Sequence, residues 1–485
     1  MADQPNLIFL MPDQLRPDFL SCYGAEFIDT PNIDRLAESG VRFTHAYSQH
    51  PVCVPARASL LTGMDAIKTG VLDNGLYLRP DLRACGIATW PELLSEQGYL
   101  TAGIGKMHFY PWDARLGFQY RRIAEDKRWL QIRDDYWHFL HAHGHRKYHG
   151  NEHPGYFENR GAIVNRLPWE YQVDHWVGDE ACGFIRDFGH EGPFALMVGF
   201  PGPHCPYDPA PEFLAGFDPD AMPEPVPDAG DTPGLREQNI VGNRQPWNGV
   251  DYQEFTRAHK LKIRAHYAAL VKQIDDAVGR ILDTLRDRGL LENTIIVFAS
   301  DHGDYLGDHN LIGKGQFFEA SFHVPLLVSQ PGVPGGTTCD DLVALTDVTA
   351  TLLRLAGQPV PEYMDAQPLP GIGIAGATGR DHLIGALGNG WMIQEGPWRL
   401  AKYATGEQLL FNLEADPQEQ RNLIADAGCR TVLRDLDARL TGAIMRSMVD
   451  ARFAERVYTR DLSQSPVFGY EGWQRPYPRR REDGR

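Results

Sequence analysis

Residues 53–63 read CVPARASLLTG, a short apolar stretch between a cysteine and a glycine. Pro55 suits the first turn of a helix because its missing N–H has no partner there, and Gly63 suits a C-terminal cap. We therefore expect a helix whose N-terminus presents Cys53 beside free backbone N–H groups, with Arg57 one turn further on. Such a site can hold a tetrahedral oxyanion against a nucleophile. Taken alone, the stretch also fits a buried cysteine and a solvated arginine.

Acidic residues follow two predicted strands. Asp13 comes directly after the apolar run Leu7–Met11, and Asp301-His302 follows the apolar run Thr294–Ala299. Ligands of α/β proteins gather at the carboxyl ends of parallel strands. Two carboxylates, an imidazole and the amide oxygen of Gln14 could therefore hold one divalent cation, although each aspartate also fits an ordinary turn. Oxygen ligands favour Ca²⁺, Mg²⁺ or Mn²⁺, and the histidine tilts the set toward Mn²⁺.

Apolar runs of strand length alternate with helical patterns, which predicts an α/β fold with a large, mostly parallel sheet flanked by helices. Thr89 and Glu92 form a candidate capping box. The longest helix is expected from about His266 to Arg288, where apolar residues recur along one face. After about Gly379 the pattern changes to short strands and one helix, which predicts a small C-terminal antiparallel sheet with a helix.

These patterns suggest a division of the chain. Residues 1–378 form the expected catalytic domain, with insertions at about 109–170 and 206–253 that should build pocket walls or lids. Residues 379–462 form a small α+β subdomain. Residues 463–485, rich in proline, aromatics and arginine, are expected to be a tail and a candidate oligomerisation arm, so a homo-oligomer (dimer or tetramer) is predicted.

Composition narrows the classes of partner. The chain has 485 residues, 42% hydrophobic and 23% charged, with a net charge of −17. The negative charge argues against nucleic acid or an acidic membrane as the main partner. The seven cysteines are scattered singly, so neither a zinc site nor a disulfide framework is indicated. No secretory leader or membrane-spanning run is apparent, and a cytoplasmic protein is expected.

Residues 53–63 closely resemble the signature of the formylglycine-dependent sulfatases, which have the alkaline phosphatase-like fold. Further blocks resemble those of the family in the same order, over nearly the whole chain. They are Pro5–Gln14, Thr30–Ala37, Gly105–His108, Pro203–Tyr207, Ser300–Gly303 with Lys314, and Leu409–Leu423. The resemblance implies a sulfuric ester hydrolase that acts on a small-molecule sulfate ester.

In that family a formylglycine-generating enzyme oxidises the signature cysteine to formylglycine (3-oxoalanine), and the hydrated aldehyde is the nucleophile. The resemblance implies this modification for Cys53. It also implies one divalent metal ion, Ca²⁺ or Mn²⁺ with Mg²⁺ as a further option. The metal ligands would be Asp13, Gln14, Cys53, Asp301 and His302.

The resemblance assigns further roles around that centre. Lys106 and Lys314 would bind sulfate oxygens, and Arg57 would support the aldehyde diol. Fixed cations of this kind stabilise the negative charge that moves onto the leaving oxygen. Two histidines would move protons: His204 to the leaving alkoxide, and His108 from the sulfated diol. Asn74, in a sequence that also fits an ordinary turn, would help to bind the oxyanion.

The chain departs from the commonest family pattern at two positions. Many sulfatases have a second aspartate where this chain has Gln14, and Asn or Gln where it has His302. The Asp-Gln and Asp-His pairs look more like the choline sulfatase and phosphonate monoester hydrolase branches. A phosphonate monoester or phosphodiester hydrolase is therefore the alternative function. A binding protein without catalysis, and a hydrolase that uses the unmodified Cys53 thiolate, are further alternatives. Choline, aryl and sugar sulfates all remain open as substrates.

Overall fold

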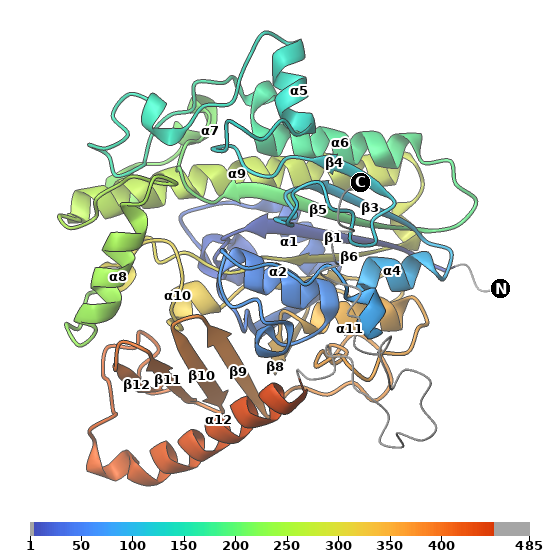
Figure 1. The fold of residues 1–485 in the computed structure, drawn as a ribbon. Coiled ribbons are helices and arrows are strands. Elements are labelled where there is room, and N and C mark those ends of the chain that lie inside the picture. Colours follow the sequence, from blue (N-terminus) through green and yellow to red (C-terminus); the bar gives the residue numbers. More distant parts are fainter. Residues whose placement is uncertain (1–3, 451–485) are drawn as a thin grey trace, which may run out of the picture.

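A computed structural model describes residues 4–450 of the chain, and Figure 1 shows its two sheets. The larger sheet has eight strands in the order β4-β3-β5-β1-β6-β7-β2-β8. Its strands are β1 (Asn6–Asp13), β2 (Gly40–Tyr47), β3 (Leu100–Gly105), β4 (Tyr120–Ile123), β5 (Phe194–Pro203), β6 (Thr294–Ala299), β7 (Leu326–Ser329) and β8 (Thr337–Ala344). Only β7 runs antiparallel to its neighbours, so the expected mostly parallel sheet is confirmed.

Helices cover both faces of this sheet. One face packs on α1 (Pro31–Glu38), α6 (Val173–Asp187) and α9 (Arg257–Asp287), and the other on α2 (Cys53–Thr62), α4 (Trp90–Ser95) and α11 (Asp347–Leu355). Side chains of β1 alternate between the two cores: Ile8 and Leu10 join the first, whereas Phe9 and Met11 join the second. A central strand buried on both faces must be apolar throughout, which is why the sequence signal there is so clear.

The smaller sheet is antiparallel and lies beside the larger one (Figure 1). Its strands are β9 (His382–Leu387), β10 (Gly390–Glu395), β11 (Trp398–Tyr403) and β12 (Gln408–Asn412). The helix α12 (Arg430–Asp450) buries Leu436 and Leu440 against Ile393 and Leu400 of that sheet. The predicted small antiparallel sheet with a helix is therefore confirmed, whereas the predicted tail at 463–485 lies outside the described residues.

Short helices complete the fold: α3 (Ala66–Thr69), α5 (Asp135–Ala142), α7 (Pro211–Leu214), α8 (Pro233–Asn243) and α10 (Glu319–Phe322). The segment 109–170 contributes the edge strand β4 and α5, and the segment 206–253 contributes α7 and α8. Between residues 4 and 450, no helix combines the length and the apolar character needed to span a bilayer.

Of two local predictions, the capping box at Thr89 is confirmed, whereas the start of the longest helix is not. The capping box forms as predicted, because the Thr89 hydroxyl accepts from the Glu92 N–H while the Glu92 carboxylate accepts from the Thr89 N–H. The predicted start of the longest helix at His266 is wrong, because α9 begins at Arg257. Its first turns carry many charged residues, which hide the helical period in the sequence.

Candidate active site

The carboxyl ends of neighbouring strands deliver most of the predicted residues to one place. Asp13 is the last residue of β1, Lys106 follows β3, His204 follows β5, and Asp301 comes two residues after β6. The strands β3, β5, β1 and β6 are adjacent and parallel, so these side chains converge at one edge of the sheet. The sheet topology therefore explains why residues up to 288 positions apart meet.

The helix α2 brings Cys53 to the same edge. Cys53 is its first residue, and Gly63 caps its C-terminus in the left-handed conformation with φ 69°, donating its N–H to the carbonyl of Ser59. Asn74 Oδ1 accepts the N–H of Val54 at 2.9 Å, which satisfies one of the free donors of the first turn. The predicted helix is thus present, with the cysteine at its N-terminus.

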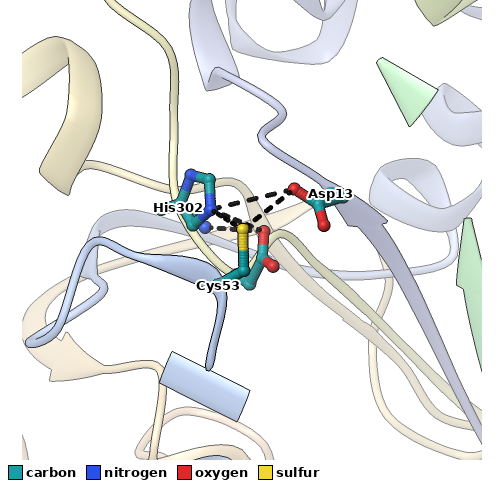
Figure 2. A group of neighbouring side chains, drawn as sticks. Asp13, Cys53 and His302 are labelled. Carbon is teal, nitrogen blue, oxygen red and sulfur yellow. Dashed lines mark hydrogen bonds and ion pairs between the residues drawn. The ribbon is translucent and has the colours of Figure 1, made fainter. Parts of the chain in front are cut away.

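Cys53 lies among three possible metal ligands. Potential ligand atoms of Asp13, Cys53, Asp301 and His302 all lie within 4.8 Å of one another, and all four residues are buried. The Cys53 sulfur is 3.1 Å from His302 Nε2 and 3.7 Å from Asp13 Oδ1. Figure 2 marks both contacts with dashed lines. Among the described residues, no other group of three or more His, Cys, Asp or Glu side chains meets the same criterion.

The donor set of this cluster fits a divalent cation. His302 Nδ1 lies 2.9 Å from the carbonyl of Gly303, which can only accept, so the ring donates there and Nε2 is the nitrogen that faces the cluster. That Nε2 lies 3.7 Å from Oδ1 of both Asp13 and Asp301. Two carboxylate oxygens and a ring nitrogen that face one another suit a bound cation.

Two buried cations, Arg57 and Lys106, contact the Oδ2 atoms of the aspartates, whereas the Oδ1 atoms face His302. Arg57 Nε and Nη2 lie 2.8 and 3.2 Å from Oδ2 of Asp301 and Asp13, and its Nη1 donates to the carbonyl of Lys106 at 2.7 Å. Lys106 Nζ is 2.7 Å from Asp13 Oδ2. Burial and the neighbouring Cys53 would raise the pKa of the Asp13 carboxyl, but the charges of Lys106 and Arg57 outweigh them and hold that pKa below its usual range. Asp13 therefore stays ionised.

Burial and nearby charges also shift the pKa of the Cys53 thiol. Burial opposes ionisation of the thiol, yet Lys314, His302 and Lys106 lower its pKa well below the usual value. An unmodified Cys53 would thus be a thiolate, which is the reactive form of a cysteine.

Lys314, Gln14 and His204 form a second group of polar side chains that contact one another. Lys314 Nζ donates to Gln14 Oε1 at 2.6 Å and lies 2.7 Å from His204 Nε2. His204 Nδ1 is 2.7 Å from the carbonyl of Cys205, so Nε2 is the acceptor for Lys314. Burial and the charges of Lys314 and Arg128 lower the pKa of His204 to about 3. The free site therefore holds a neutral His204 that accepts a hydrogen bond from Lys314.

His108 has an uncommon backbone conformation, with φ 59°. Its N–H donates to the buried Glu125 carboxylate at 3.0 Å, and its buried Nδ1 has no hydrogen-bond partner within residues 4–450. The ring packs edge-on against Trp129.

A cavity of about 740 Å³ opens above these groups. Cys53, Gln14, Asn74, His108, His204 and Lys314 line it. Asp13, Arg57, Lys106, Asp301 and His302 lie beneath, each at most 3% exposed. The structure thus brings all the sequence-predicted site residues together, in an outer layer that lines the cavity and a buried charged layer directly beneath it.

The sequence analysis missed three buried carboxylates that surround the site. Glu125 holds His108, Asp126 Oδ2 lies 3.9 Å from Lys106 Nζ, and Asp304 accepts from Gln14 and Tyr207. Glu125 and Asp126 follow β4. The rule that located Asp13 and Asp301 would have found them if that edge strand had been recognised.

Comparison with known proteins agrees with this geometry. The sequence model of the family described as Sulfatase matches residues 5–358. An arylsulfatase of Clostridium perfringens is 33% identical over 449 residues, which cover 87% of this chain and 90% of that protein. A choline-sulfatase of Rhizobium meliloti is 31% identical, with 90% of this chain and 86% of that protein covered.

Solved structures support the fold. The phosphonate monoester hydrolase of Agrobacterium radiobacter superimposes with a TM-score of 0.78 at 22% identity, covering 91% of this chain and 96% of that one. At that identity the likeness concerns the architecture, which is the alkaline phosphatase-like fold. Since the family model spans most of the chain and the arylsulfatase matches nearly all of it, this chain belongs to the sulfatase family.

Proposed function

We propose that this protein is a sulfuric ester hydrolase that uses a formylglycine made from Cys53 and one divalent metal ion. The observation that carries the proposal is the position of Cys53. Its sulfur lies against Asp13 and His302 at the base of a cavity, and cationic side chains surround it. Family membership supports the same activity. A formylglycine-generating enzyme is the maturation partner that this proposal requires.

Asp13, Gln14, Asp301 and His302 would hold the metal ion, together with the group derived from Cys53. The ion supplies fixed positive charge to a sulfate oxygen and to the nucleophile when bound. Hard oxygen ligands favour Ca²⁺ or Mg²⁺, while the His302 nitrogen favours Mn²⁺. Our preference is Ca²⁺ or Mn²⁺.

The remaining side chains have separable tasks. Lys106 and Lys314 bind sulfate oxygens, and Arg57 holds both aspartates in place through its fork of donors. The leaving oxygen receives its proton from the Lys314–His204 pair, because Lys314 donates to the only free ring nitrogen of His204. His108 also lines the cavity and accepts the proton that is released when the nucleophile is regenerated.

A specific observation keeps phosphonate monoesters or phosphodiesters as a second substrate class. Two solved neighbours are phosphonate monoester hydrolases, and Asp13, Asp301 and His302 of the Asp-Gln and Asp-His pairs lie in the metal cluster. Sulfate and phosphonate monoesters share a tetrahedral centre and a single negative charge, so one cationic pocket can bind both. We expect the sulfate ester to be the better substrate and the phosphonate to be a slower one.

The test combines mass spectrometry with kinetics. Peptide mass analysis should find Cys53 converted to formylglycine after co-expression with a generating enzyme. Protein converted in this way should hydrolyse 4-nitrophenyl sulfate faster than 4-nitrophenyl phenylphosphonate, and Cys53→Ala should hydrolyse neither. Full conversion without turnover of either ester would instead support a binding protein. Turnover by wholly unconverted protein would support the thiolate mechanism.

A further inference from the structure

The cavity above Cys53 is larger than a sulfate group requires. Cavities of about 300–1,000 Å³ hold whole organic ligands, and this one has a volume of about 740 Å³. Its outer wall comes from four separate segments: the loop at 72–75, Arg128-Trp129, α8 with the following residues 247–248, and the Gly388-Asn389 turn between β9 and β10. This outer wall must contact the part of the substrate that leaves with the ester oxygen.

The outer wall carries little net charge. Asp73 is the only carboxylate among its lining residues, and the Arg128 guanidinium is paired with Asp126 through two hydrogen bonds of 2.9 and 2.7 Å. A quaternary ammonium group needs aromatic faces without a competing cation. Arg128 already lies over the Trp247 ring, 5.3 Å from its centroid. The wall therefore does not suit a cationic leaving group such as choline.

Side-chain amides dominate the polar part of this wall. Asn243 and Asn248 bond to each other at 2.8 Å, and the Tyr156 hydroxyl donates to Asn248 at 2.7 Å, so these amides hold the wall rigid. Gln238 and Asn389, two further lining residues, form what we call the rim of the cavity. Asn389 Nδ2 donates to Gln238 Oε1 at 3.1 Å. That bond leaves Asn389 Oδ1 as an acceptor and Gln238 Nε2 as a donor, with no other hydrogen-bond partner within residues 4–450.

The rim thus offers a donor and an acceptor side by side, and two indole rings lie within the same wall. Trp129 is fixed by His108, and Trp247 is fixed by a 3.0 Å bond from its Nε1 to the carbonyl of Gly242. A plain aryl group would cover the rim amides without bonding them, which costs free energy. Neighbouring hydroxyl groups both donate and accept, so they satisfy both amides while the apolar face of the ring packs on an indole.

Building on the proposed sulfatase activity, we infer that the leaving group is a neutral, hydroxylated ring, so that the substrate is a sugar sulfate. Gln238 and Asn389 are the residues that select it. They come from α8 and the β9–β10 turn, so the substrate bridges the catalytic domain and the small sheet.

The experiment compares substrates on protein with confirmed Cys53 conversion. The panel is a hexose 6-sulfate, an N-acetylhexosamine 6-sulfate, choline sulfate and 4-nitrophenyl sulfate. We expect kcat/KM for the better sugar sulfate to exceed that for choline sulfate at least tenfold. Gln238→Ala and Asn389→Ala should each lower the ratio of sugar to nitrophenyl activity about tenfold, mainly through KM. Gln97→Ala, which removes an exposed amide outside the cavity, should leave both activities unchanged.

The outcomes separate the two proposals. Preference for choline sulfate, or rim variants that weaken sugar and nitrophenyl sulfates equally, would overturn the sugar inference while the sulfatase activity stands. Absence of turnover on 4-nitrophenyl sulfate and on every other sulfate in the panel, with full conversion of Cys53, would overturn the proposed function itself.

Discussion

The side-chain amide of Gln14 donates to Oδ2 of Asp304, and this turns its oxygen toward Lys314. Within residues 4–450, the Asp304 carboxylate also accepts hydrogen bonds from the N–H groups of Leu306 and Gly313 at 3.0 and 2.8 Å and from the Tyr207 hydroxyl at 2.7 Å. A carboxylate at position 14 would face this buried carboxylate directly. Asp304 therefore explains why an amide, rather than a second aspartate, follows Asp13.

Gln14→Glu should test this relationship, since it replaces the amide by a carboxylate of the same shape. We expect a loss of about 2–4 kcal/mol in unfolding free energy. Divalent-ion affinity should also fall 10- to 100-fold, because the oxygen at position 14 is no longer held in place. Urea unfolding and Mn²⁺ titration by electron paramagnetic resonance would measure the two effects.

Gln14→Glu combined with Asp304→Asn supplies the control, because the donor and the acceptor are exchanged while the shapes stay the same. The double variant should recover most of the stability and the affinity. If it is no better than Gln14→Glu alone, Asp304 does not decide the residue type at position 14.

Arg57 should matter more for stability than a typical arginine. Its three buried contacts reach Asp13, Asp301 and the carbonyl of Lys106, and lysine cannot form all three. Arg57→Ala should cost about 3–5 kcal/mol, and Arg57→Lys somewhat less, because buried carboxylates lose their partner. Arg35→Ala breaks a surface pair with Asp283 and should cost less than about 1 kcal/mol. Equal losses at positions 57 and 35 in urea unfolding would contradict the buried network.

Removal of the metal should lower both activity and melting temperature. An ion present at 100 times its dissociation constant stabilises a protein by about 2.7 kcal/mol. EDTA followed by dialysis should abolish turnover, and Ca²⁺ or Mn²⁺ should restore it. Elemental analysis of untreated protein should find one ion per chain, and His302→Ala should bind it more weakly. If elemental analysis shows that the treated protein contains no metal, and its melting temperature and activity are nevertheless unchanged, then the protein does not use a metal ion.

The raised pKa of the buried Asp174 carboxyl predicts a specific pH dependence of the free energy of unfolding. Burial raises its pKa to about 6, against the partial opposition of Lys127, and its Oδ1 accepts the N–H of Gly202 at 2.9 Å. Because the pKa is higher in the folded state than in the unfolded state, the folded state loses stability as pH rises from about 4 to about 6, and no further loss follows above that range.

Asp174→Asn removes this ionisation and keeps an acceptor for Gly202. We expect the variant to equal the wild type near pH 4 and to be more stable above pH 6 by up to about 3 kcal/mol. Asp287→Asn, at an exposed position near the end of α9, should follow the wild-type curve between these values. A constant difference between the Asp174 variant and the wild type across the whole range would contradict the raised pKa.

The sequence was most informative where burial leaves only one choice of residue. The core strands β1 and β6 are buried over their whole length and consist mostly of apolar residues, so their ends, and with them Asp13 and Asp301, could be located. The edge strand β4 contains Tyr120, Arg121 and Arg122 and is only partly buried, so no period marks it as a strand. Glu125 and Asp126 were missed for that reason.

Other features depend on contacts that a linear pattern does not contain. The N-terminal part of α9 includes Arg264, which is buried because it donates to the carbonyl of Leu306 and pairs with Asp308. The orientation of Gln14 depends on Asp304, 290 residues away. Polar networks of this kind are specified by the tertiary fold, whereas the sequence shows only that polar residues are present.

Glu125 is the missed residue with the clearest expected effect on catalysis. Its carboxylate accepts the N–H of His108, whose φ of 59° is uncommon for a residue with a side chain. Such a conformation costs about 1–3 kcal/mol and persists only where the surroundings hold it. Glu125 is therefore a positioning residue that keeps the His108 ring over the cavity.

Glu125→Leu should release the His108 backbone and lower kcat at least tenfold, with a smaller change in KM. Glu125→Gln keeps an oxygen that can accept the same N–H, so it should retain most of the wild-type kcat. A crystal structure of each variant would show whether His108 keeps its positive φ. If both variants lose activity equally while the His108 backbone stays in place, then the charge of Glu125, rather than its hydrogen bond, is what the site requires.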